Sequence, residues 1–269
     1  MTPINIDDFE KDSYQNGIRY WFAHEFMVKL GYENWMTFKG VITKAMASCS
    51  NLGIDSDECF IPENTTDVAG RPFKTYRLSR FACFLITMQA DDKKPEVQHA
   101  KVILSAIAAQ LIDSQVGDND IARLEARKDL TAANKILTGA AKANGVQSHQ
   151  FGLFQDAGFR GMYDMSLDEL KRYKNIDSKA TAYDFMGLTE LAGNLFRVTQ
   201  TTERLRSSSA DGVQAAMSTA KAVGKEVRTM MYRNSGILPE DLAIEDNVSE
   251  VKKRLKASNR EMKKLDKKK

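Results

Sequence analysis

Residues 184–202 read Asp-Phe-Met-Gly-Leu-Thr-Glu-Leu-Ala-Gly-Asn-Leu-Phe-Arg-Val-Thr-Gln-Thr-Thr, and no other stretch is as informative about the fold. Apolar and small residues recur in it at helical spacing, which predicts an amphipathic helix with a buried stripe. The predicted stripe consists of Leu188, Leu191, Ala192, Leu195, Thr199 and Thr202. The residues off this stripe are a hydrogen-bonding set instead of the usual Glu/Lys coat: Thr189, Glu190, Asn194, Arg197 and Gln200.

Two interpretations of this polar set stay open. The side chains satisfy buried polar groups where helices pack, which is a common use of such residues. Alternatively they form a recognition surface for a protein partner, since such surfaces combine apolar contacts with a few oriented polar groups. Gly187 and Gly193 favour close helix packing and so the first interpretation.

Working outward, the chain predicts a compact α+β unit followed by a helical region. Asn16-Gly17 between aromatic runs is a strong hairpin signal. A second strand pair is expected at 59–64 and 73–78. Helices are expected at 24–30, 35–51, 79–89, 95–112, 118–144, 147–157, 166–173, 188–205 and 213–232. With the likeliest boundary at Gln115–Asp118, the predicted domains are 1–115, 116–247 and a basic tail, 248–269.

Composition places the protein in a broad class. A chain of 269 residues with 42% hydrophobic content suits one or two globular domains. Its apolar runs fall short of the roughly 18 residues needed to span a bilayer, and its acidic beginning does not resemble a secretory signal. Three cysteines without a Cys-x-x-Cys pair favour a reducing compartment, so we expect a cytoplasmic protein, although a Cys49–Cys59 bridge stays open.

The net charge of +3 hides an asymmetry. From Val248 onward there are ten Lys/Arg and three Asp/Glu, so the preceding residues carry 29 basic and 33 acidic groups. The body is therefore not a basic protein. Any affinity for nucleic acid must come from local patches or from the tail.

Motifs for catalysis are missing. Gly224-Lys225 lacks the upstream glycine and the following Ser/Thr of a phosphate loop. His24-Glu25 does not continue into a His-Glu-x-x-His zinc motif, and the three histidines are scattered. We expect no enzymatic activity, no cofactor and no metal.

One basic segment suits a nucleic-acid strand. Cations recur every three residues with aromatic rings between them, at Arg71, Lys74, Arg77 and Arg80. Cations meet phosphates while rings stack on bases. If 73–78 is a strand, Lys74 and Arg77 point to opposite faces, and half of the set is then a solvated edge. Lys39 and Lys44 on the neighbouring helix extend the predicted nucleic-acid-binding set.

The tail has three interpretations. Val248, Val251, Leu255, Met262 and Leu265 follow a 3-4 spacing, with Ser258 at the position that should be apolar. The segment is a frayed, solvated terminus, or an appendage that adds DNA affinity electrostatically, or a short coiled coil that mediates assembly.

Several strings resemble the DinD (DNA-damage-inducible protein D) family. The segment 184–202 resembles the family's Met-Gly, Thr-Glu-Leu-Ala, Asn-Leu-Phe-Arg and Thr-Gln-Thr run. Further strings follow in the family's order over about residues 20 to 242: Leu30-Gly31-Tyr32 with Trp35, Phe38 and 47–49, then 78–85, 94–97, 154–163, 223–228 and 238–242. The first of these resembles the start of a BRO-N domain, which opens DinD proteins.

The resemblance implies a BRO-N-like N-terminal domain with two β-hairpins packed on helices and a mainly helical DinD-type C-terminal domain. It also implies a non-enzymatic role in the SOS damage response, in which the protein binds and inhibits RecA recombinase filaments on single-stranded DNA. The alternatives are a DNA-binding prophage antirepressor or transcription regulator, since BRO-N domains also occur in such proteins, and a phage defence or counter-defence module.

Overall fold

The chain folds into two compact units, one of them discontinuous in sequence. A computed structural model describes residues 6–66, 71–112, 118–207 and 212–267. Unit 1 comprises residues 1–121 together with 250–269, and unit 2 comprises residues 122–249. The predicted boundary at Gln115–Asp118 falls, apart from Asp118, outside the described residues.

Unit 1 contains an antiparallel sheet of four strands in the order β1-β2-β4-β3. Strand β1 (Tyr14–Asn16) and β2 (Ile18–Phe22) form a hairpin around Gly17, whose φ of 72° suits glycine. Strand β3 (Phe60–Thr66) pairs with β4 (Pro72–Leu78) from Phe60–Leu78 to Thr66–Pro72. Both predicted hairpins are confirmed, because their turn signals are local.

The described part of unit 1 before α6 contains the helices α1 (Ile6–Lys11), α2 (Ala23–Lys29), α3 (Trp35–Leu52), α4 (Arg80–Gln89) and α5 (Pro95–Ile112). A short 3-10 turn, η1 (Ser56–Glu58), links α3 to the sheet. Ser79 caps α4 by accepting a hydrogen bond from the backbone N–H of Ala82. Helix α4 is buried almost all round and forms the centre of the core of unit 1.

Unit 2 is helical. Its elements are α6 (Asp118–Ala143), which starts in unit 1, η2 (Ser148–Gln150), α7 (Phe151–Tyr163), α8 (Leu167–Tyr173), η3 (Ala182–Phe185), α9 (Leu188–Ser207), α10 (Val213–Ser235) and η4 (Pro239–Asp241). Ser166 and Glu169 form a capping box that begins α8, close to the start predicted for this helix. Among the described residues of this unit the only β-type pairing is an isolated bridge between Met186 and Ile244.

Helices α7 and α10 approach closely through glycines. A Cβ on Gly161 would lie 2.2 Å from the carbonyl oxygen of Lys221, and one on Gly224 would lie 2.7 Å from that of Gly158. The predicted end of this helix at Ala157 is therefore wrong. Gly158 and Gly161 continue the helix to Tyr163 because they admit the neighbouring backbone.

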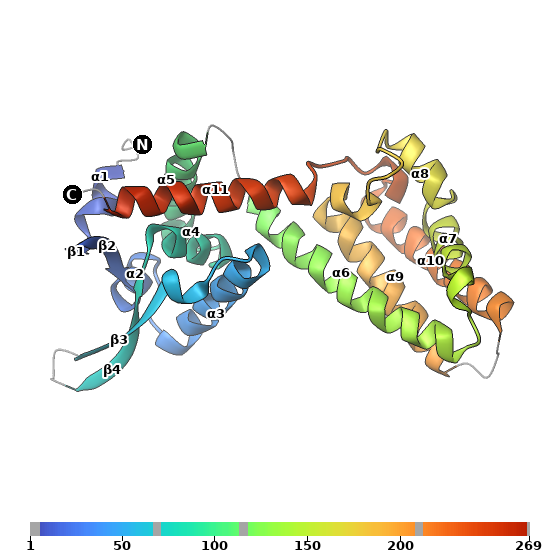
Figure 1. Cartoon of the computed structure of the whole chain (residues 1–269), viewed down its shortest axis with the longest axis horizontal. Coiled ribbons are helices and arrows are strands. Elements are labelled where there is room, and N and C mark those ends of the chain that lie inside the picture. The colour runs from blue at the N-terminus through green and yellow to red at the C-terminus, as the bar shows by residue number, and fades with distance from the viewer. Residues whose placement is uncertain (1–5, 67–70, 113–117, 208–211, 268–269) are drawn as a thin grey trace. The chain divides into compact units, whose positions relative to one another are not determined.

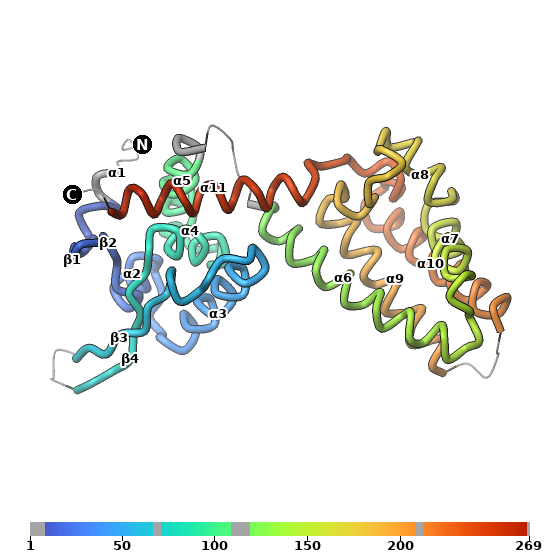
Figure 2. Tube along the Cα trace, in the orientation of Figure 1, coloured from blue at the N-terminus to red at the C-terminus, as the bar shows by residue number. Residues whose placement is uncertain are grey.

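The last helix, α11 (Val248–Lys267), belongs with unit 1 from Glu250 onward. Figure 2 shows its red trace running back along the first third of the chain. Val251, Leu255 and Met262 are buried on its inner face. The expectation of a frayed, solvated terminus is wrong, since the apolar 3-4 spacing is used to pack this helix on the N-terminal unit. The predicted α+β class is confirmed.

Candidate nucleic-acid interface

Helix α3 carries two of the predicted DNA-binding residues on its surface. Lys39 and Lys44 are both exposed, and the 18 residues of the helix include no Asp or Glu. Lys44 lines a groove of about 650 Å³ together with Asn34, whose side chain caps the helix by accepting from the N–H of Thr37. The groove combines the cations of Lys44 and Lys94 with hydrogen-bonding groups and with the carboxylates of Glu33 and Asp91.

The β3–β4 hairpin carries two more. Figure 1 shows this hairpin extending beyond the helices of unit 1. Arg71, next to β4, and Lys74, which pairs with Asn64 across the hairpin, are exposed. Phe73 is half-buried, and its ring packs edge-on against the imidazole of His24 with 5.0 Å between centroids. The hairpin therefore presents exposed cations to a nucleic acid, whereas the ring of Phe73 is already packed and is not free to stack on a base.

Arg77 is already engaged within unit 1. Its Nε lies 2.8 Å from a carboxylate oxygen of Glu63, and its guanidinium lies 5.4 Å from the centre of the Tyr20 ring. Strand β4 pairs with β3 in a regular register from Pro72 to Leu78. Since side chains alternate along a strand, Lys74 and Arg77, three residues apart, point to opposite faces of the sheet. Arg77 thus shapes the sheet face away from Lys74.

Arg80 does not belong to a DNA-binding surface. Its side chain is fully buried, and its Nε and backbone N–H both donate to Asp266 at 3.0 Å. Glu10 lies 2.8 Å from the same guanidinium, which also faces the rings of Phe9 and Trp21. This prediction was wrong because the partners that bury Arg80 come from opposite ends of the chain.

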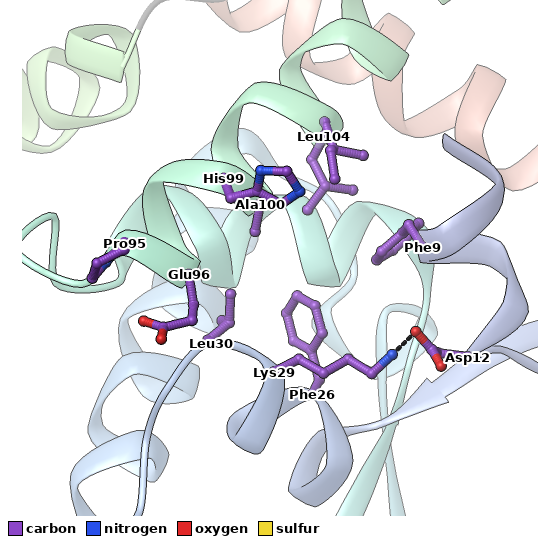
Figure 3. A pocket seen from close by; sticks show the side chains of 11 residues that line it. Phe9, Asp12, Phe26, Lys29, Leu30, Pro95, Glu96, His99, Ala100 and Leu104 are labelled. Atoms are coloured by element: carbon purple, nitrogen blue, oxygen red, sulfur yellow. Dashed lines mark ion pairs between the residues drawn. The ribbon is translucent and has the colours of Figure 1, made fainter. Parts of the chain in front are cut away.

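Unit 1 also has an apolar pocket of about 420 Å³ between α1, α2 and α5. Figure 3 shows the rings of Phe9 and Phe26 and the side chain of Leu104 around it, with the ion pair of Lys29 and Asp12 at its edge. Burial lowers the pKa of the Lys29 ammonium group. Such a lining suits an apolar group with a polar end.

The predicted partner-binding set of α9 is divided by the structure. Glu190, Asn194 and Arg197 are buried, Thr189 is exposed and Gln200 is half-buried. The helix is rotated relative to its predicted stripe, because Leu188, Ala192 and Thr199 face solvent. A recognition role for the three buried residues is therefore wrong.

These buried residues form a polar network in the core of unit 2. Asn194 donates to the hydroxyl of Tyr163 at 2.6 Å, and Arg197 donates to Asn194 at 3.0 Å and to Tyr183 at 3.1 Å. The ammonium group of Lys174 lies 3.0 Å from Glu190. Burial raises the pKa of Glu190 even though Lys174 opposes this shift. The network joins α7, the end of α8 and η3 to α9.

The outer face of α9 holds a residue that the sequence interpretation missed. Phe196 is 44% exposed and lies one to two helical turns from Thr189 and Gln200. Exposed aromatic rings beside polar groups are typical anchors of protein interfaces. The sequence contained a signal for this exposure, because Phe196 is an aromatic residue that lies off the predicted buried stripe.

Other kinds of site find no support in the described residues. No group of three or more His, Cys, Asp or Glu side chains there could hold a metal ion. No helix of that part of the chain is long and apolar enough to cross a membrane. Cys49, Cys59 and Cys83 are free thiols buried in unit 1.

Comparison with known proteins assigns the family. Residues 117–251 match the model of the DinD C-terminal domain. The chain is 33% identical over 241 residues to DNA damage-inducible protein D of Escherichia coli (strain K12), an alignment that covers 84% of this chain and 87% of that protein. The chain belongs to the DinD family. The matched DinD C-terminal domain coincides with unit 2 within a few residues, so most of α11 lies beyond it.

Proposed function

We propose that this DinD-family chain acts in the DNA-damage response by binding and inhibiting RecA recombinase filaments on single-stranded DNA, without catalysing a reaction itself. The observation that carries the proposal is the 33% identity, over most of both chains, to a protein named for its induction by DNA damage. The inhibition of RecA is the finer part of the proposal and rests on the DinD resemblance.

The two units supply two kinds of surface for this role. Unit 1 exposes cations on α3 and on the β3–β4 hairpin: Lys39, Lys44, Arg71 and Lys74. Phosphate contacts of this kind give affinity without sequence preference, which suits a protein that must follow recombinase anywhere on single strands. Unit 2 offers the exposed Thr189 and Phe196 and the half-buried Gln200 on α9 as the proposed protein-binding face.

Inhibition of a filament requires differential affinity. A protein that binds free recombinase and the assembled filament equally well shifts no equilibrium between them. Contacts to DNA phosphates and to a recombinase surface at the same time favour the filament, because only the filament offers both. The combination of a cationic surface and an exposed aromatic anchor supports this mechanism.

The test is strand exchange with purified recombinase and increasing amounts of this protein. We expect exchange to fall as the protein saturates the filament. Phe196→Ala should relieve the inhibition, whereas Met230→Ala, which removes a similarly exposed side chain from α10, should not. Undiminished exchange at saturating protein would refute the proposal, and tight binding to a specific duplex operator instead would favour the antirepressor or regulator alternative.

A further inference from the structure

Helix α11 is held firmly against unit 1. Its buried residues recur along one face: Val251, Leu255, Ser258, Asn259, Met262 and Asp266. The thiol of Cys59 lies 3.9 Å from the side-chain oxygen of Asn259, and Lys263 pairs with Glu58. These contacts tie α11 to η1 and to the start of β3.

A buried ion pair fixes the end of the helix. Asp266 is 2% exposed and accepts hydrogen bonds from both the backbone and the guanidinium of Arg80. Breaking such a pair leaves an uncompensated buried charge, so detaching α11 is costly. The orientation of the helix about its own axis is thereby set.

The outward face of α11 carries four cations. Lys253, Arg260, Lys264 and Lys267 are exposed, and their spacings of seven, four and three residues place them on one side. Lys253 and Lys264 are 72% and 68% exposed, and each pairs with an acid three residues earlier on the same helix, Glu250 and Glu261. Among the described residues no carboxylate forms an ion pair with Arg260 or Lys267. The four cations extend over about 21 Å of helix.

This face suits a phosphate backbone better than a membrane or a protein. The apolar face of α11 is already buried in unit 1, so the helix has nothing to insert into a bilayer. The outward face lacks the aromatic anchors that give protein interfaces their binding energy. A row of cations on a rigid helix suits the row of phosphates along a DNA strand, because each cation can neutralise a phosphate whatever the base.

We infer that the outward face of α11, formed by Lys253, Arg260, Lys264 and Lys267, is a binding surface for the phosphate backbone of single-stranded DNA, separate from the cations of α3 and the β3–β4 hairpin. The inference rests on the proposed role at single-stranded DNA. It adds that the C-terminal helix is docked as a preformed cationic ridge instead of trailing as a flexible appendage. Such a ridge loses less conformational freedom on binding than a disordered segment.

The test is binding of fluorescein-labelled oligo(dT) to the full chain across a potassium chloride series, with no recombinase present. The test variant carries Lys253→Gln, Arg260→Gln, Lys264→Gln and Lys267→Gln. Its matched control carries Lys135→Gln, Lys221→Gln, Lys225→Gln and Arg233→Gln, four exposed cations of unit 2. Both variants change the net charge equally, and all eight side chains lie on the surface, so both should fold.

The expected result is a weaker affinity and a log–log salt slope flatter by about 2 to 3 in the α11 variant, since each single-strand contact contributes roughly 0.7. Arg260→Gln alone should flatten the slope by about 0.7. An unchanged slope, or equal losses in both variants, would overturn the inference. Strand exchange then tests the proposed function separately, because an inhibitor that acts through α9 and α3 would still inhibit with α11 neutralised.

Discussion

A single buried residue, Arg80, connects three helices of unit 1. It is buried among the rings of Phe9 and Trp21 and pairs with Glu10 and Asp266, so one guanidinium joins α1, α4 and α11. Burial raises the pKa of Asp266 even though Arg80 holds its carboxylate by hydrogen bonds. The pair therefore defines where the helices meet more than it adds to stability, in keeping with the high desolvation cost of buried charges.

Removing one partner should be far more damaging than removing a surface acid. Asp266→Ala removes the carboxylate that accepts two hydrogen bonds from the buried Arg80 and leaves Glu10 as an ion-pair partner of the guanidinium. Because buried donors lose their acceptor, the free energy of unfolding of unit 1 should fall by about 2 to 3 kcal/mol. The measurement is urea unfolding followed by tryptophan fluorescence, because the two tryptophans, Trp21 and Trp35, both lie in unit 1. Glu261→Ala, an acid with a surface partner on the same helix, is the control. A loss below about 1 kcal/mol, typical of a surface pair, would contradict this account of Asp266.

His24 should make unit 1 sensitive to pH. Burial lowers the pKa of its imidazole, and Nδ1 lies 3.0 Å from the hydroxyl of Thr75. The folded state therefore takes up a proton less readily than the unfolded state, whose pKa is near 6.5. The stability contribution is complete above that pH and is lost as the pH falls from 6.5 toward the lower folded pKa. Tryptophan-monitored unfolding of the wild type and of His24→Asn across this range should show a smaller pH dependence in the variant, and equal dependence in both would contradict the assignment.

At the scale of elements, close packing of α7 on α10 explains the glycines of unit 2. Gly161 and Gly224 lie where any side chain would meet backbone atoms of the other helix. Glycine weakens a helix by about 1 kcal/mol relative to alanine, so its presence here reflects tertiary contact instead of local preference.

Two substitutions on α7 separate the effect of close packing from the effect of helix propensity. Gly161→Ala should destabilise α7 and α10 by about 1 to 3 kcal/mol, because the added methyl group meets the carbonyl of Lys221. Gly152→Ala, which has open space around its Cβ, should stabilise α7 by about 0.5 to 1 kcal/mol. Amide hydrogen exchange of the two helices in the full chain measures both. If both substitutions stabilised the helices, helix propensity and not packing would determine the effect of alanine at these two positions.

Local signals explain which elements could be predicted from the sequence. Asn16-Gly17, the cap at Ser79 and the capping box at Ser166 act through neighbours in the chain, so the corresponding hairpin and helices were predicted correctly. The rotation of α9 could not be predicted, because the partners of Asn194 and Arg197 come from distant segments. Four of the six predicted DNA-binding residues are exposed. The burial of Arg80 could not be predicted, because its partners also come from distant segments.

At the scale of the whole molecule, the chain leaves unit 1 after residue 121 and returns to it at residue 250. The DinD C-terminal domain is therefore inserted between two parts of one folded unit. Deleting residues 248–269 would expose the apolar surface that Val251, Leu255 and Met262 cover, so truncation tests folding as well as DNA binding. Substitution of outward cations is the cleaner experiment.

The proposed function requires that the chain bind assembled RecA filaments more tightly than free recombinase or bare DNA, and a comparison of the three affinities tests this preference. Binding should be measured by fluorescence anisotropy or interferometry to filaments on oligo(dT), to free recombinase and to bare oligo(dT), at one salt concentration. We expect the tightest binding to the filament, with Phe196→Ala reducing this preference and Met230→Ala preserving it. Equal affinity for the filament and bare oligo(dT), or for the filament and free recombinase, would contradict it.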